Sequence, residues 1–127
     1  MHIILSNDEI KQVLTTCFSD GGIELLRGCG VYIRHSDEDY EAARKSLEYP
    51  CMEDVFTQMV MEKRRVYFLE TEDGEDGEIE LTLEKITERW KSPEIQDDIY
   101  EILNGDYDAT PCYRVLQYAL YGELKWG

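Results

Sequence analysis

Residues 66–83 read VYFLETEDGEDGEIELTL, and this stretch decides the fold class. Its first four residues are β-branched, aromatic or apolar, and its last six alternate between polar and apolar side chains. Such alternation is the pattern of a strand with one buried face. Residues 73–77, Asp-Gly-Glu-Asp-Gly, separate the two halves and are typical of a turn. The stretch therefore predicts an antiparallel hairpin with one face in the core and the other in water.

A helix is predicted near the N-terminus. Ser6 and Glu9 form a capping box, in which the Ser6 side chain accepts from the Glu9 amide and the Glu9 side chain reaches back. Gly21 and Gly22 end the helix, because glycine tolerates a positive φ. The apolar stripe between these ends has helical spacing and consists of Ile10, Val13, Leu14, Cys17 and Phe18.

Three weaker patterns lie between this helix and the hairpin. Residues 29–34 are β-branched and aromatic and predict a short strand. Ser36 has the sequence context of a helix cap, and Pro50 interrupts the helix that it starts. Residues 52–60 have helical spacing, although their β-branched and aromatic side chains also permit a strand. The methionines among them are typical of core packing.

Two helices are predicted after the hairpin. Thr82 or a neighbouring residue starts the first, which carries Trp90. Ser92 and Pro93 open the second, because proline suits the first helical position. Gly105 closes the second helix, whose apolar residues are Ile95, Ile99, Ile102 and Leu103.

A last helix is predicted with Thr110 as its N-cap and Pro111 as its first residue. Arg114, Tyr118 and Tyr121 lie opposite its apolar side, and this composition is favoured at protein interfaces. Either they form such an interface, or a neighbouring element of the same domain covers them. The tail ELKWG is expected to be extended and able to pair with a strand. The apolar side consists of Cys112, Val115, Leu116, Ala119 and Leu120.

These patterns predict an α+β fold. We expect a single small domain over residues 1–127, in which an antiparallel hairpin or sheet packs against several helices, including the N-terminal and C-terminal ones. A chain of 127 residues, 43% of them hydrophobic, is long and apolar enough to form one core. The same apolar content argues against a disordered acidic tail.

The chain is strongly acidic, with 13 Lys and Arg against 28 Asp and Glu, a net charge of −15. Such a charge repels phosphate backbones and anionic lipids, so we expect neither direct nucleic-acid binding nor membrane binding. Two interpretations stay open. The carboxylates simply face water and keep the protein soluble, or they imitate nucleic acid and dock on a basic partner.

The cysteines predict neither a metal site nor a cofactor. Cys17, Cys29, Cys51 and Cys112 are scattered, without a C-x-x-C pair and without a neighbouring histidine. The N-terminus lacks the basic lead of a secretion signal, and no apolar run is long enough for a membrane helix. We therefore expect a cytoplasmic protein with reduced thiols.

The segment GDYDATP, residues 105–111, has the D-x-D-x-T spacing of aspartate-based phosphatases. In those enzymes the cluster ends the first strand of a large parallel sheet, whereas here a helical pattern precedes it and the chain soon ends. We interpret Asp106 and Asp108 instead as charges near the positive end of the last helix. A calcium loop is excluded, because Pro111 and Gln117 occupy positions that require Gly and Glu.

Nucleophilic chemistry has little support. His35, Ser36 and Asp37 are adjacent in sequence, whereas the members of a triad are adjacent in space. A nucleophilic cysteine paired with His35 stays open, but no pattern supports it. Gly28 and Gly30 form only an isolated G-x-G, which is a weak phosphate-binding signal. We therefore expect no enzyme activity.

Three segments resemble a known family: LSNDEIKQVLTTCFSDGGI (5–23), RRVYFLETEDGEDGEIELTLEKI (64–86) and DYDATPCYRVLQYALYGELKWG (106–127). They are similar to small uncharacterised accessory proteins of bacteriophages and prophages, which end in a D-x-D-A…LQYALFGE-hydrophobic-YG signature. Trp126 replaces the final aromatic Tyr, and residues 36–63 have no counterpart. The resemblance implies an accessory protein in the cytoplasm of a bacterial host and supplies no catalytic residues.

We therefore expect a non-enzymatic phage accessory protein that binds a host protein, as an inhibitor of host defence or of a nucleic-acid-handling protein, with DNA mimicry as one version. The alternatives are a self-assembling structural protein, such as a homodimer, and a small-molecule or nucleotide-binding protein. The predicted acidic surface has a hairpin block, Glu70, Glu72, Asp73, Glu75, Asp76, Glu78 and Glu80, and a helix block, Glu94, Asp97, Asp98 and Glu101. The candidate self-assembly residues are Arg114, Tyr118 and Tyr121, and the candidate ligand-binding basic residues are Arg27, Arg34, Lys63, Arg64 and Arg65.

Overall fold

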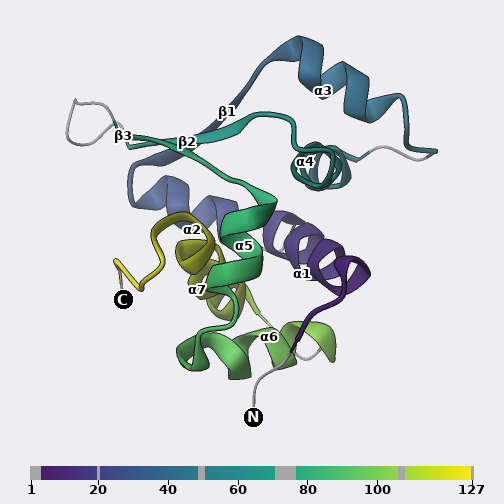
Figure 1. Cartoon of the computed structure of the whole chain (residues 1–127). Coiled ribbons are helices and arrows are strands. Elements are labelled where there is room, and N and C mark those ends of the chain that lie inside the picture. The colour runs from purple at the N-terminus through teal and green to yellow at the C-terminus, as the bar shows by residue number, and fades with distance from the viewer. Residues whose placement is uncertain (1–3, 20, 49–50, 71–76, 106–107, 127) are drawn as a thin grey trace.

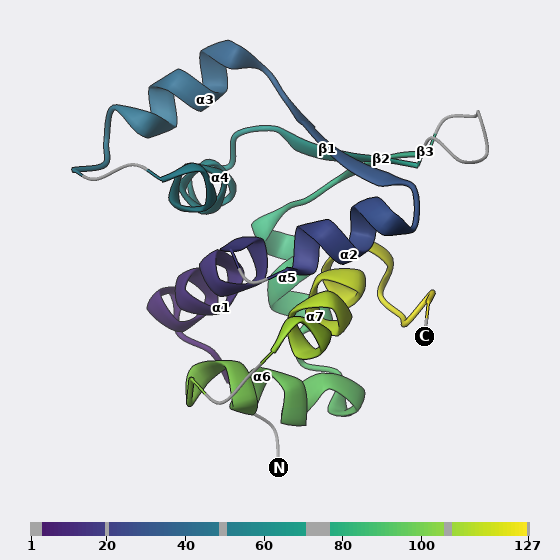
Figure 2. The ribbon, with the colours of Figure 1, turned by 180° about the vertical axis from the view of Figure 1, so that it is seen from behind.

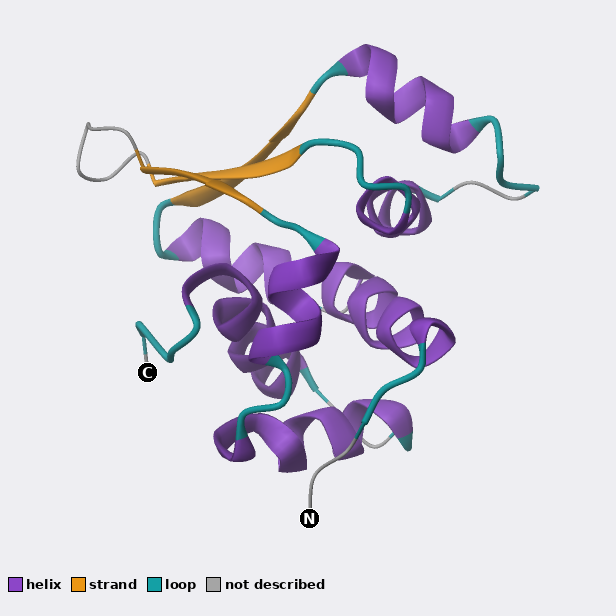
Figure 3. Ribbon diagram, viewed as in Figure 1, coloured by secondary structure: helices purple, strands orange, loops and turns teal. Residues whose placement is uncertain are grey.

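The computed structural model describes residues 4–19, 21–48, 51–70, 77–105 and 108–126. Its helices and strands are, in chain order, α1 (Asn7–Ser19), α2 (Gly22–Gly28), β1 (Val31–His35), α3 (Asp37–Arg44), α4 (Met52–Met61), β2 (Val66–Glu70), β3 (Gly77–Glu80), α5 (Leu83–Arg89), the 3-10 helix η1 (Pro93–Ile95), α6 (Gln96–Leu103) and α7 (Ala109–Tyr121). The predicted α+β fold class is confirmed (Figure 1, Figure 3).

The strands form one antiparallel sheet in the order β1-β2-β3. The central strand β2 contributes Val66 and Phe68 to the core, and neither side chain is exposed to solvent. Ile33 and Ile79 flank Phe68 in register on the two edge strands. The predicted hairpin strands are thus confirmed, and so is the strand predicted within 29–34, which the structure places at Val31–His35. Of the turn predicted at 73–77, residues 73–76 lie outside the described residues, and Gly77 is the first residue of β3.

Most of the helices are arranged in layers on one side of the sheet, whereas α3 lies apart from them, at the opposite end of the molecule from α6 (Figure 1, Figure 2). In both views α2, α5 and α7 lie between the sheet and α6, and α6 is the helix farthest from the sheet (Figure 1, Figure 2). The α3–α4 pair extends from β1 and returns to β2, with α4 packed against α1. The stretch 52–60, for which the sequence permitted either a helix or a strand, is helix α4.

The helix α7 is the centre of the helical layer, and it contacts α1, α2, α5 and α6. Of the two interpretations of the side opposite its apolar stripe, coverage by neighbouring elements of the same domain is therefore the one observed. Gln117 is fully buried and Tyr118 is only 6% exposed, and both lie on that side. Neighbouring helices on several sides leave this helix little contact with water.

A glycine pair allows the chain between α1 and α2 to pack closely on α7. Gly21 has a φ of 94°, which favours glycine, and a Cβ there would lie 2.8 Å from the Cβ of Ala109. A Cβ on Gly22 would lie 2.5 Å from the carbonyl oxygen of Cys17 and 2.8 Å from Cδ1 of Leu116. Gly21 and Gly22 end α1 as predicted, but α2, which starts directly after the turn, was not predicted.

Several predicted helix starts are confirmed. Ser6 and Glu9 form the reciprocal capping box at the start of α1, with distances of 3.0 and 3.2 Å. The Ser36 hydroxyl accepts from the Asp39 amide at 3.0 Å at the start of α3. The Thr82 hydroxyl accepts from the Lys85 amide at 3.2 Å at the start of α5.

The start of α7 and the tail after it differ from the prediction. The N-cap is Asp108 rather than Thr110, because the Asp108 carboxylate accepts from the Thr110 amide at 2.8 Å and the helix begins at Ala109. The described tail, residues 123–126, forms no strand. It instead packs on α7, where the Trp126 amide donates to Oε1 of Gln117 at 2.8 Å.

Candidate functional site

A groove about 480 Å³ in volume lies between α6 and the start of α7. We call it the α6–α7 groove, and it is lined by Glu94, Asp97, Asp98, Glu101, Asp108, Thr110, Pro111 and Arg114. It contains the whole predicted helix block of acidic residues and adds Asp108 to it. Five carboxylates thus face one guanidinium in a single open groove.

The helical period of α6 places two of these carboxylates, those of Asp97 and Glu101, on the surface. Ile99 and Ile102 are buried, so the positions between the apolar residues point away from the core. Asp97 and Glu101 accordingly lie on the exposed side of the helix. The segment enters the core again at α7, whose N-cap Asp108 brings its carboxylate to the other wall of the groove.

The one guanidinium of the groove is already engaged. Nε of Arg114 lies 3.0 Å from Oδ2 of Asp98, and the same guanidinium contacts the Glu94 carbonyl oxygen at 3.5 Å. The Glu94 carboxylate accepts from the Tyr118 hydroxyl, and this hydrogen bond raises the pKa of Tyr118. Within the described part of the chain, no ion pair neutralises Asp97 or Glu101. The groove therefore has excess negative charge available to a partner.

In the hairpin block, two of the described carboxylates are paired with basic side chains. The Glu70 carboxylate pairs with Nζ of Lys125 at 2.8 Å, and Glu78 pairs with Arg34. Glu80 lies half-buried on β3. The remaining residues of this block, Glu72, Asp73, Glu75 and Asp76, lie outside the described residues. The described hairpin acids thus offer less free charge than the groove.

The candidate self-assembly residues are covered by other parts of the same chain. Tyr118 is buried, and Arg114 is held by Asp98. The Tyr121 hydroxyl is buried, and the Tyr121 ring packs edge-on against Trp126 with centroids 5.5 Å apart. Burial raises the pKa of Tyr121, with the Glu70 carboxylate as the second cause. Of the two interpretations of this face, coverage by neighbouring elements is the one observed.

The five candidate ligand-binding basic residues are not brought together. Arg34 pairs with Glu78, and Lys63 pairs with Glu84 at 3.2 Å. Arg27 is different, because it lines a separate open hollow near the C-terminal tail.

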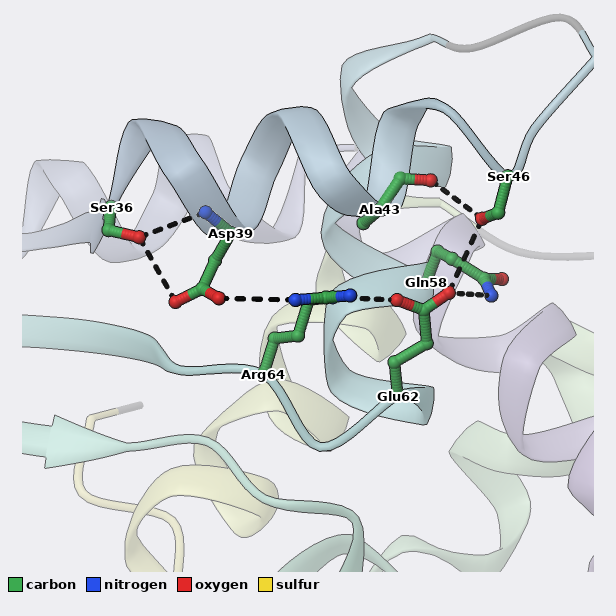
Figure 4. Close-up of polar contacts among 7 residues, drawn as sticks. All are labelled: Ser36, Asp39, Ala43, Ser46, Gln58, Glu62 and Arg64. Carbon is green, nitrogen blue, oxygen red and sulfur yellow. Dashed lines mark hydrogen bonds and ion pairs between the residues drawn. The ribbon is translucent and has the colours of Figure 1, made fainter.

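Arg64 belongs to a polar network that joins α3 to the end of α4 (Figure 4). Its guanidinium reaches Oδ1 of Asp39 at 3.3 Å and Oε1 of Glu62 at 2.7 Å. The Glu62 carboxylate also accepts from Nε2 of Gln58 at 2.8 Å and from the Ser46 hydroxyl at 3.3 Å. The Gln58 hydrogen bond, followed by that from Arg64, lowers the pKa of Glu62. Since each partner is engaged, this network holds α3 in place.

The catalytic candidates are occupied by structural contacts. The Ser36 hydroxyl caps α3 and donates to Asp39 at 3.0 Å. Nδ1 of His35 lies 3.1 Å from the Ser36 carbonyl oxygen, and its ring stacks on Tyr40 at a centroid distance of 4.8 Å. The described contacts of His35 are thus with a backbone carbonyl and aromatic rings, and the Ser36 hydroxyl serves as a helix cap.

Among the described residues, no three His, Cys, Asp or Glu side chains are placed to hold a metal ion together. No helix in the described ranges combines the length and apolarity that crossing a membrane requires.

Sequence reasoning missed the hollow near the tail. It is lined by Arg27, Gly28, Cys29, Gly30, Tyr32 and Trp126, which come from two segments far apart in the chain. The R-G-C-G sequence was too short a signal to reveal it.

Comparison of the chain with protein-family models, with curated proteins and with solved structures finds no match.

Proposed function

We propose that this chain is a non-enzymatic accessory protein that binds a basic protein of a bacterial host through the α6–α7 groove. The observation that carries the proposal is the groove's lining of five carboxylates against one guanidinium that is already paired. The sequence resemblance to phage and prophage accessory proteins supplies the proposed setting, the cytoplasm of a bacterial host.

The charge of the whole chain supports a basic partner. A net charge of −15 draws basic surfaces at long range and speeds their encounter. Lysine and arginine side chains of a partner are complementary to the carboxylates of Asp97 and Glu101, which are exposed and lie in the groove. Proteins that handle nucleic acids present such basic grooves, so a DNA-mimic inhibitor of one of them is the specific version that we favour.

The test is affinity capture from bacterial lysate with two double variants. Asp97→Asn with Glu101→Gln removes two charges from the groove and leaves the Asp98–Arg114 pair and the Asp108 cap in place. Glu38→Gln with Glu48→Gln removes two exposed charges from the α3 region and is the matched control. We expect the wild type and the control to recover the same basic protein and the groove variant to lose it.

Salt provides the second arm of the test. Exposed charges are screened over about 10 Å at 0.1 M salt, so the affinity of the captured protein should fall at least about tenfold between 50 and 300 mM NaCl. Recovery of the same partner by the groove variant, or capture that is insensitive to salt, would contradict the proposal.

Self-assembly receives no separate support from the face that was expected to mediate it, because Tyr118 is buried and Arg114 is paired. Small-molecule binding has a specific observation in its favour, the hollow beside Arg27.

A further inference from the structure

We propose that the hollow beside the C-terminal tail binds a small planar aromatic molecule that carries an oxyanion, either a carboxylate or a phosphate. We call this site the tail hollow, and its lining residues are Arg27, Gly28, Cys29, Gly30, Tyr32 and Trp126. Its volume of about 490 Å³ falls within the range of small-molecule sites. The proposal is independent of protein binding at the α6–α7 groove.

The charge of the tail hollow is opposite to that of the rest of the molecule. Its lining contains the Arg27 guanidinium and no carboxylate, in a chain with 28 Asp and Glu. The Arg27 side chain is exposed, and a guanidinium matches the planar fork of a carboxylate or phosphate. The backbone amides of Cys29 and Gly30 already donate to Leu26 and Arg27 carbonyls, at 2.9 and 3.0 Å. Arg27 is therefore the group that holds the anion.

Two aromatic side chains supply the surface for a planar ring. Tyr32 is 42% exposed on the edge strand β1, and Trp126, which lines the same hollow, comes from a segment nearly a hundred residues later in the chain. Indole and phenol rings stack on flat aromatic ligands with little loss of side-chain freedom. An aromatic ligand is thus favoured over an aliphatic one.

Trp126 is held in position before any ligand arrives. Its amide donates to Gln117, its ring packs edge-on against Tyr121, and Nζ of Lys125 lies 5.0 Å from its ring centroid. Lys125 is in turn tied to Glu70 at 2.8 Å. A wall fixed in this way reduces the ordering cost of binding.

One of the lining residues of the tail hollow, Cys29, also serves as a reporter of binding. Cys29 is half-buried, and its Sγ lies 3.0 Å from the Tyr113 hydroxyl. Cys51 is exposed and does not line the hollow, whereas Cys17 and Cys112 are buried. A ligand in the hollow should shield Cys29 from alkylation and leave Cys51 unaffected. Cys51 is therefore an internal control in the same protein.

The experiment measures the iodoacetamide alkylation rates of Cys29 and Cys51 by peptide mass spectrometry. The probes are AMP and indole-3-acetate, which carry a ring and an oxyanion, adenosine, which carries only the ring, and inorganic phosphate. We expect AMP and indole-3-acetate to slow Cys29 alkylation at least threefold without changing Cys51. Adenosine and phosphate should each bind at least about tenfold more weakly, since each lacks one of the two interactions.

Two variants locate the binding. Arg27→Gln should weaken AMP and indole-3-acetate about tenfold and leave adenosine unchanged, since it removes the oxyanion contact and retains the aromatic walls. Arg65→Gln removes the same charge from an exposed site on the α4–β2 connection and is the matched control. Trp126→Leu should weaken all three aromatic probes, and circular dichroism checks that each variant is folded.

Several outcomes would overturn the proposal. They are no protection of Cys29 at 5 mM probe, equal protection of Cys51, equal binding of adenosine or phosphate, and an Arg65→Gln variant that is as impaired as Arg27→Gln. The groove variant Asp97→Asn with Glu101→Gln should retain AMP binding. Loss of host-protein capture and loss of ligand binding are thereby distinguished.

Discussion

Glu70 shows how much a single carboxylate depends on its partners. Its side chain is 14% exposed at the end of β2, and its carboxylate lies 2.8 Å from Nζ of Lys125. The hydrogen bond from Lys125 is the largest cause that lowers the pKa of Glu70 below its ordinary value of 4.5. The folded state therefore favours the charged form of this residue.

Glu70→Gln should lower the free energy of unfolding at pH 7 by about 1 kcal/mol. Because the folded-state pKa is lowered, the stabilisation is complete above the unfolded value of 4.5 and is lost as the pH falls through the folded value. Urea unfolding of the wild type and the variant at pH 7 and at successively lower pH should show two curves that converge in acid. Glu101→Gln removes an exposed charge that has no ion pair in the described part of the chain. It should leave the free energy of unfolding at pH 7 unchanged. A loss for Glu70→Gln that persists unchanged in acid would contradict this account.

At this scale the sequence reveals the carboxylates but not their partners. Glu70 and Lys125 are 55 residues apart, and Arg34 and Glu78 are 44 apart. The dense acidic run of the hairpin therefore predicted a charged surface, although two of its described members, Glu70 and Glu78, pair with distant cations. The helix block was predictable as a cluster because its members are close in sequence, on η1 and α6, and line one groove.

Among the elements, α2 packs so closely on its neighbours that its first residue, Gly22, has no room for a side chain. Gly22→Ala should lower the free energy of unfolding by about 3 kcal/mol, because the new Cβ would lie 2.5 Å from a backbone carbonyl that has no room to move. Gly28→Ala, at the other end of the same helix, meets no atom within 4 Å. It should raise stability by about 0.5 kcal/mol through helix propensity. Chemical denaturation of both variants checks the pair, and equal effects would show that close packing at Gly22 is unimportant.

There are physical reasons why the sequence did not predict some features of the elements. The seven residues of α2 are too few for an apolar period to be visible, and tertiary packing rather than propensity holds them. The residues of α7 that a projection assigns to an outer side, such as Gln117, are buried because other helices reach that side. Longer patterns with caps, such as α1 and its capping box, were predicted well.

In the whole molecule the charge is distributed unevenly. Helix α6 lies at the end farthest from the sheet (Figure 1). In the α6–α7 groove that it lines, carboxylates outnumber cations. The tail hollow, beside the sheet, has a cation and no carboxylate in its lining. Two surfaces of opposite charge would let one small protein meet two chemically different ligands.

The net charge itself should destabilise the fold through self-repulsion. Surface ion pairs such as Lys63–Glu84 contribute at most about 1 kcal/mol each, and salt weakens them too. The 28 acidic residues outnumber the 13 basic ones, so screening of repulsion should outweigh the loss of ion pairs. Raising NaCl from 20 to 500 mM at pH 7 should therefore increase the Tm by about 3–5 °C, as thermal unfolding followed by circular dichroism would show.

The matched control for this prediction is pH. Near the sequence pI of about 4.4 the net charge approaches zero, and no net repulsion is left for salt to screen. The same salt increase should then leave the Tm unchanged or lower it by weakening the ion pairs that persist. A Tm that falls with salt at pH 7 would mean that paired charges, rather than the excess of carboxylates, dominate the electrostatics. In that case the α6–α7 groove would hold too little free charge to attract a basic partner at long range.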